Sequence, residues 1–102
     1  MTLDYYQSAA SKYMQPQCNN KEYLALGLCG EAGEVADKIK RIIRGDGKID
    51  DDLLYEIGDT LWYISQLADF FCVDMSKLAQ MNLDKLQSRL DRDRIKGTGD
   101  KR

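Results

Sequence analysis

Breaks in regular structure are scarce in this chain. Its 102 residues include a single proline, Pro16, and two glycines separated by one residue occur only at residues 45–47 and 97–99. Because proline and glycine are the strongest local breakers, the chain divides into long uninterrupted segments. None of these segments alternates apolar and polar residues over the length of a strand. The sequence therefore predicts an all-α chain of four helices followed by a charged tail.

Capping signals set the boundaries of the first two helices. The first covers about residues 3–14, since the residue before Pro16 is disfavoured in a helix. Asn20 is the expected N-cap of the second helix, which ends before Gly45 with basic side chains in its last turn. The second helix is therefore expected to be unusually long for so short a chain.

Acidic residues mark where the next two helices begin. Residues 50–52 are all aspartate and cap a third helix that ends near residue 71, and Asp74 caps a fourth that ends near residue 90. The Gly-Asp-Gly turn makes a long antiparallel hairpin of the second and third helices. Such long helices have more apolar surface than one short chain can cover, so we expect the hairpins to assemble into an oligomeric helical bundle.

Length and charge limit the classes of protein. We expect one α-helical domain, residues 1–95, and a basic C-terminal tail, residues 96–102. A formal net charge of −2 argues against a protein that binds nucleic acid through bulk charge. No apolar run reaches the ~20 residues that span a bilayer, and no signal-peptide pattern opens the sequence. We therefore expect a cytoplasmic protein without nucleic-acid or membrane partners.

The cysteines and the lack of histidine restrict the chemistry. Three widely spaced cysteines fit reduced thiols, and we expect Cys29 and Cys72 to be small core residues. The absence of histidine excludes the usual zinc sites and the Ser-His and Cys-His catalytic arrangements. Any chemistry must therefore come from carboxylates, lysine, tyrosine or a hard metal ion.

Two pairs of carboxylates lie next to the apolar stripes of the long helices. The stripes are Leu24, Leu28, Val35, Ile39 and Ile42 in the second helix and Leu53, Ile57, Leu61, Ile64, Ala68 and Phe71 in the third. Glu31 points within about 20° of Leu24, a core position of the second helix, and Glu34 follows at i+3. Glu56 and Asp59 repeat this spacing along the border of the stripe of the third helix. Because the two helices are expected to be antiparallel neighbours, the two pairs can converge.

Four carboxylates in a partly dry site need neutralisation. A divalent cation supplies it, and oxygen ligands alone favour Mg²⁺ or Mn²⁺. Because Mg²⁺ typically adds phosphate oxygens as ligands, the natural substrate is a nucleotide or another polyphosphate. The alternative is a non-catalytic α-helical oligomeric interaction module whose acids are solvated surface charges.

The surrounding residues resemble a known family. The segments Gly27–Asp37 and Leu54–Tyr63 are similar to the MazG-like nucleoside triphosphate pyrophosphohydrolases of the all-α NTP pyrophosphatase superfamily, whose signature is an ExxE pair and an ExxD pair. The segments Asn82–Arg89 and Lys96–Arg102 extend the resemblance over most of the chain. Many members carry a further glutamate where this chain has Gly30.

The resemblance implies a reaction and an assembly. The reaction is Mg²⁺-dependent hydrolysis of a nucleoside triphosphate, with a deoxynucleotide as the expected substrate, between the α and β phosphates. The products are the monophosphate and pyrophosphate, and the implied role is house-cleaning of the nucleotide pool. The fold is an α-helical homodimer, or a homotetramer of two dimers, with active sites at helix interfaces. Related phosphoribosyl-ATP pyrophosphohydrolases and dimeric dUTPases share the metal site, but the short chain and its tail resemble the MazG-like branch more.

Roles for individual residues follow from position and resemblance together. We expect four carboxylates to hold the metal: Glu31, Glu34, Glu56 and Asp59. Of these, Glu34 and Glu31 are the candidates for accepting a proton from the attacking water. We expect the polar and cationic side chains of Lys38, Asn82, Lys85, Arg89 and Lys96 to bind the triphosphate. Trp62 projects away from the apolar stripe and either stacks on the base or fills a subunit interface.

Overall fold

The structure is a computed structural model of the chain and describes residues 1–92, 97 and 99. These described residues contain helices and no strand, which confirms the all-α prediction for them. The elements in chain order are α1 (Leu3–Ala10), the 3₁₀ turns η1 (Ser11–Tyr13) and η2 (Pro16–Cys18), α2 (Lys21–Arg44), α3 (Asp51–Phe70) and α4 (Met75–Asp91).

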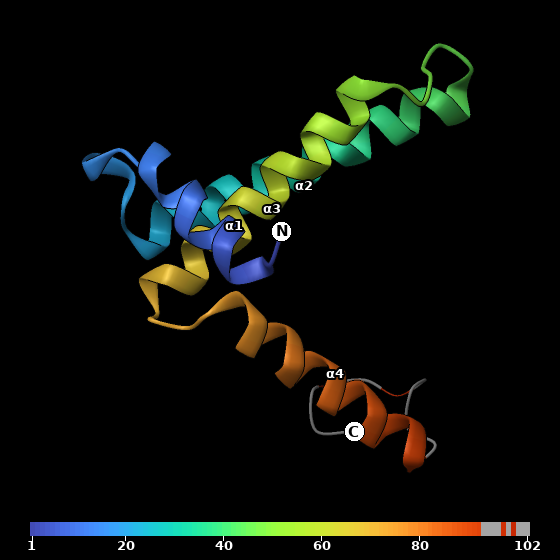
Figure 1. Cartoon of the computed structure of the whole chain (residues 1–102). Helices are drawn as coiled ribbons and strands as arrows, with labels where there is room; N and C mark the ends of the chain where they lie inside the picture. The colour runs from blue at the N-terminus through green and yellow to red at the C-terminus, as the bar shows by residue number, and fades with distance from the viewer. Residues whose placement is uncertain (93–96, 98, 100–102) are drawn as a thin grey trace.

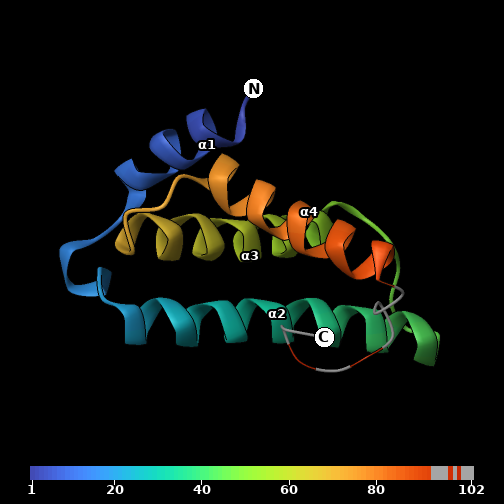
Figure 2. The ribbon, with the colours of Figure 1, turned by 90° about the horizontal axis from the view of Figure 1, so that it is seen from below.

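Helices α2 and α3 form the longest packed unit. They lie side by side and are joined at one end by the loop of residues 45–50 (Figures 1 and 2). Helix α1 packs near the opposite end of this pair, where α4 also begins. From there α4 diverges from the α2–α3 pair, as Figure 1 shows. Within the described part of the chain, no helix is both long and apolar enough to cross a membrane.

The predicted caps of the two long helices are present. Asn20 accepts a hydrogen bond from the backbone N–H of Tyr23 at 2.8 Å and so caps α2. Asp50 caps α3 by accepting from the N–H groups of Asp52 and Leu53 at 3.1 and 3.4 Å. Gly45 ends α2 with φ +98°, a left-handed conformation that glycine adopts without strain. Local sequence signals therefore decide at which residues α2 begins and ends and at which residue α3 begins.

The first helix is shorter than predicted. It ends at Ala10, and residues 11–13 tighten into the 3₁₀ turn η1. The Ser11 hydroxyl donates to the carbonyl of Ser8 at 2.7 Å, which stabilises this tighter turn. Gln15, before the proline, is extended at ψ 139°, as the sequence predicts. Because α1 ends at Ala10, residues 11–13 do not continue it, and η1 lies beside α3.

Helix α4 is capped by a different element from the one predicted. Asp74 stands at the N-cap position, but its side chain makes no capping hydrogen bond. Instead, Asp4 of α1 accepts from the N–H and hydroxyl of Ser76 at 2.9 and 2.7 Å, which lowers the pKa of Asp4. Gln7, also on α1, accepts from the N–H of Met75 at 2.9 Å. Helix α1 therefore fixes where α4 starts and in which direction it leaves.

The buried core is small for the length of the chain. Its apolar residues are Ala10, Leu24, Leu53, Ala68 and Met75. Other residues of the predicted stripes are exposed, among them Ile39, Ile57, Leu61 and Phe71. The accessible surface is 7661 Å², whereas a compact monomer of this mass exposes about 5,900 Å². The radius of gyration is 16.2 Å, against about 13 Å for a compact chain. A single copy thus leaves extensive apolar surface uncovered.

The expectation that Cys29 and Cys72 belong to the core is wrong. Both are exposed and free. Cys72 follows α3 with φ +59°. Its N–H donates to the carbonyl of Asp69, and the N–H of Val73 donates to Ala68, both at 2.9 Å. This is the Schellman arrangement, in which glycine is the favoured residue at the left-handed position.

We expect Cys72→Gly to stabilise the protein by about 0.5–1 kcal/mol, because glycine relieves the left-handed strain at a small entropic cost. The measurement is chemical denaturation under reducing conditions. The matched control is Cys29→Gly, which replaces an exposed cysteine inside α2 and should destabilise the protein by about 0.5 kcal/mol. Equal effects at the two positions would contradict this explanation.

Candidate active site

Three carboxylates from two helices meet between α2 and α3. Glu31 comes from α2, and Glu56 and Asp59 come from successive turns of α3. One oxygen from each of the three lies within 4.8 Å of the other two. Glu31 and Glu56 are half-buried, whereas Asp59 is exposed. We call these three residues the acid cluster.

Glu34 is an exposed neighbour of the acid cluster and not one of its three members. Partial burial raises the pKa of Glu31, and a hydrogen bond with Glu56 and the charges of Asp59, Glu56 and Glu34 raise it further. Burial, followed by the charge of Asp59, also raises the pKa of Tyr6 on α1. The cluster therefore carries unfavourable negative charge that a bound cation would relieve.

The donor set of the acid cluster fits a hard divalent cation. It offers only carboxylate oxygens, and oxygen-only sets favour Mg²⁺ or Mn²⁺ over softer metals. The three oxygens lie close enough together to contact one ion. Without a cation, nothing offsets the repulsion between the carboxylates, which contributes to the raised pKa of Glu31. Exposure of Asp59 leaves one side open to a further ligand. The arrangement can hold a metal that also contacts phosphate.

A pocket of about 550 Å³ adjoins the acid cluster. Two of the cluster's carboxylates, Glu31 and Asp59, line it together with three aromatic residues, Tyr13, Trp62 and Tyr63. The sequence identified Trp62 as a candidate, but Tyr13 was missed because it lies in a turn without helical periodicity. Tyr13 is exposed, and Trp62 and Tyr63 are half-buried. Carboxylates beside such accessible aromatic rings suit a ligand with a charged end and a flat apolar end.

The two aromatic residues on α3 are held in place by their neighbours. The indole N–H of Trp62 donates to the carbonyl of Ala10 at 3.1 Å. The rings of Trp62 and Tyr63 meet edge to face, with centroids 5.0 Å apart. The Tyr63 ring lies against Gly27 of α2, where a Cβ atom would overlap it. The bare backbone of Gly27 thus provides room for one wall of the pocket.

We expect Gly27→Ala to destabilise the protein by about 1–3 kcal/mol, because the added methyl group must displace the Tyr63 ring. The matched control is Gly30→Ala on the same helix, where a Cβ atom meets nothing within 4 Å. That change should stabilise the protein by up to about 1 kcal/mol through helix propensity. Thermal melts of both variants test the pair, and a stabilising Gly27→Ala would contradict the packing argument.

The predicted phosphate-binding residues of α4 lie apart from the acid cluster within one chain. Asn82 and Lys85 line another pocket, of about 490 Å³, with apolar residues that include Leu78 and Met81. Arg89 is only 4% exposed, and its Nη2 donates to the carbonyl of Gly99 at 3.2 Å. The structure therefore does not bring these side chains together with the three carboxylates in a single copy.

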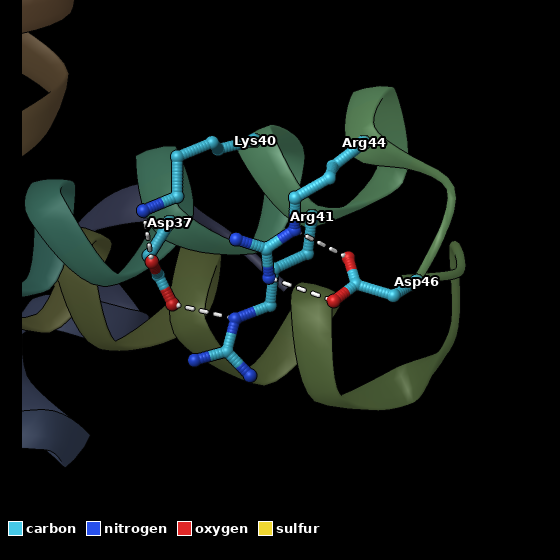
Figure 3. Close-up of polar contacts among 5 residues, drawn as sticks. All are labelled: Asp37, Lys40, Arg41, Arg44 and Asp46. Atoms are coloured by element: carbon cyan, nitrogen blue, oxygen red, sulfur yellow. Dashed lines mark hydrogen bonds and ion pairs between the residues drawn. The ribbon is translucent and has the colours of Figure 1, made fainter.

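Lys38 lies further along α2, near the loop that joins α2 to α3. It lines a pocket of about 180 Å³ with Arg41, Asp46 and neighbouring loop residues. Figure 3 shows ion pairs at this end of α2, where Arg41 pairs with Asp37 at 3.0 Å and Arg44 pairs with Asp46 at 2.7 Å. Lys38 is thus placed with the loop and not in the acid-lined pocket. Lys96 lies outside the described residues.

Comparison with known proteins identifies the family. The sequence pattern of the MazG nucleotide pyrophosphohydrolase domain matches residues 19–92, which include the acid cluster and all of α4. The chain is 47% identical to the Gene 37 protein of Mycobacterium phage L5, over 114 aligned positions that cover the whole of both chains. No solved structure matches the chain. The match to most of its length shows that this chain belongs to the MazG nucleotide pyrophosphohydrolase domain family.

Proposed function

We propose that this chain hydrolyses nucleoside triphosphates, with deoxynucleotides as the main substrates, between the α and β phosphates. The reaction releases the monophosphate and pyrophosphate and requires Mg²⁺, for which Mn²⁺ can substitute. The observation that carries the proposal is the acid cluster beside an aromatic pocket, inside the segment that matches the family. House-cleaning of the nucleotide pool is the corresponding biological role.

The carboxylates have two tasks in this proposal. Glu31, Glu56 and Asp59 hold the metal, and Glu34 joins them as a fourth ligand from the next turn of α2. When bound, Mg²⁺ neutralises phosphate charge and makes water a better nucleophile. Glu34 or Glu31 accepts the proton of the attacking water, since both lie on the same side of α2 at i and i+3.

We also propose that the functional unit is a homo-oligomer, either a dimer or a tetramer, built from antiparallel α2–α3 hairpins. A single copy exposes about 1,800 Å² more than a compact monomer. A standard interface buries about 800 Å² per partner, so this excess is sufficient for an interface. In such an assembly α4 of one copy brings Asn82 and Lys85 to the acid cluster of the other, which unites groups that lie apart in one chain.

The direct test is a panel of nucleoside and deoxynucleoside triphosphates incubated with the protein and Mg²⁺. Products are resolved so that monophosphate plus pyrophosphate is distinguished from diphosphate plus phosphate. We expect pyrophosphate release that disappears in EDTA. No product from any nucleotide, together with no Mg²⁺-dependent rise in melting temperature, would contradict the proposal and favour a non-catalytic interaction module.

A further inference from the structure

Tyr13 is the least expected member of the pocket beside the acid cluster. It lies in the turn η1, between the end of α1 and the extended Met14. The residue is 67% exposed although it lines a concave site. It also lies outside residues 19–92, which match the family.

Trp62 and Tyr13 are linked through the backbone at the start of η1. The indole N–H of Trp62 donates to the carbonyl of Ala10, three residues before Tyr13. This bond ties the turn that carries Tyr13 to α3. It also occupies the only hydrogen-bond donor of the indole, so Trp62 offers a ligand its ring and no polar group.

We propose that Tyr13 and Trp62 form a slot that binds the nucleobase by stacking, while Glu31 and Asp59 face the phosphate end in the same pocket. This inference rests on the proposed function, because it concerns the substrate of that site. Stacking on an aromatic ring tolerates every base, since each base has a π face. The slot therefore recognises the presence of a base and discriminates weakly among bases.

The test uses the only tryptophan of the chain as its reporter. Trp62 supplies the indole fluorescence, so a base stacked on it should quench the signal. The probes are α,β-methylene analogues of one purine and one pyrimidine nucleoside triphosphate, and inorganic tripolyphosphate as the ligand without a base, all with Mg²⁺. We expect both analogues to quench and to bind with similar affinity. Tripolyphosphate should bind without quenching.

Three variants test whether the ring of Tyr13 contributes to base binding. Tyr13→Ala should raise the dissociation constants of both analogues by about 5- to 100-fold and leave that of tripolyphosphate unchanged. Tyr13→Phe keeps the ring and should stay within about twofold of the unaltered protein. The matched control is Tyr5→Ala, since Tyr5 is 62% exposed and does not line the pocket. Melting curves confirm that each variant folds.

Several outcomes would overturn the slot. One is binding of the analogues without quenching of the Trp62 fluorescence. Another is a Tyr13→Ala variant that binds the analogues as tightly as the unaltered protein does. A third is a Tyr13→Ala variant whose affinity for tripolyphosphate falls as much as its affinity for the analogues. If pyrophosphate release persists in any of these cases, only the slot fails and the proposed function stands. If neither analogue binds while tripolyphosphate does, the slot fails together with the assignment of nucleotides as substrates.

Discussion

Glu56→Gln is expected to lower the rate of pyrophosphate release by about 10³-fold or more, since it removes a carboxylate that we propose as a metal ligand without changing side-chain size. The same change should raise the melting temperature of the metal-free protein. Partial burial raises the pKa of Glu31, and the hydrogen bond with Glu56 and the charges of Asp59, Glu56 and Glu34 raise it further, so the ionised cluster is electrostatically unfavourable when no cation is present. The variant should therefore be less active when Mg²⁺ is present and more stable when no metal is present.

The stabilisation by Glu56→Gln should depend on pH in a defined direction. The pKa of Glu31 is raised in the folded protein, so the folded state binds that proton more tightly than the unfolded chain. The repulsion thus costs the most stability above the folded-state pKa of Glu31, and the cost fades between that pKa and the lower pKa of Glu31 in the unfolded chain. Melts in EDTA should show the gain of the variant at neutral pH. The gain should shrink as the pH falls through the folded-state pKa and vanish below the unfolded-state pKa.

A charge-matched control separates this effect from a general change in net charge. Glu22 lies in the first turn of α2, exposed and ion-paired with Lys21. Glu22→Gln removes the same charge far along the helix from the cluster, and it should leave turnover unchanged and give no gain in stability. A Glu56→Gln variant that retains a rate near that of the unaltered protein would refute the role of the acid cluster.

The helix pattern of this chain was predictable because its signals are local. Asn20, Gly45 and Asp50 lie within a few residues of the backbone groups that they cap or terminate. The convergence of Glu31 with Glu56 and Asp59 follows from the same regularity, since i, i+3 spacing on two adjacent helices places carboxylates on facing flanks.

Features that depend on contacts distant in sequence were not predictable. Asp4 caps α4 from 72 residues away, so the local candidate Asp74 was the natural but wrong choice for the capping bond. Tyr13 reaches the pocket because α1 ends early and Trp62 bonds to Ala10, 52 residues away. Neither arrangement leaves a periodic signal in the sequence.

The apolar stripes were predicted as core, yet part of them is exposed in one copy. Periodicity reports which face of a helix avoids water, but it does not report whether the same chain or a second copy covers that face. Ile57 and Leu61 on α3 belong to the predicted stripe and are exposed. This distinction gives the proposed oligomer a direct biochemical test.

Mixing two inactive variants is expected to restore about a quarter of the activity. Glu56→Gln damages the acid cluster, and Lys85→Ala removes a proposed phosphate contact on α4. If Lys85 of one copy serves the acid cluster of the other, each mixed dimer contains one site with both residues intact. Random pairing makes about half of the dimers mixed, so about one quarter of all sites are functional. Each variant alone should be at least about 10²-fold slower at substrate concentrations well below KM.

The matched control is a mixture of Glu56→Gln with Asp59→Asn. Both residues belong to the acid cluster of one chain, so every site in a mixed dimer lacks one carboxylate and activity should not return. The variants are co-expressed with different affinity tags, and part of the protein is purified through both tags to confirm that copies associate. Every dimer in this doubly tagged fraction is mixed, so about half of its sites should be active, against about a quarter in the unfractionated mixture. Restoration in the first mixture alone would place Lys85 and the acid cluster on different copies. A doubly tagged dimer that stays inactive in both mixtures would refute the shared site, because each chain would then have to supply its own Lys85.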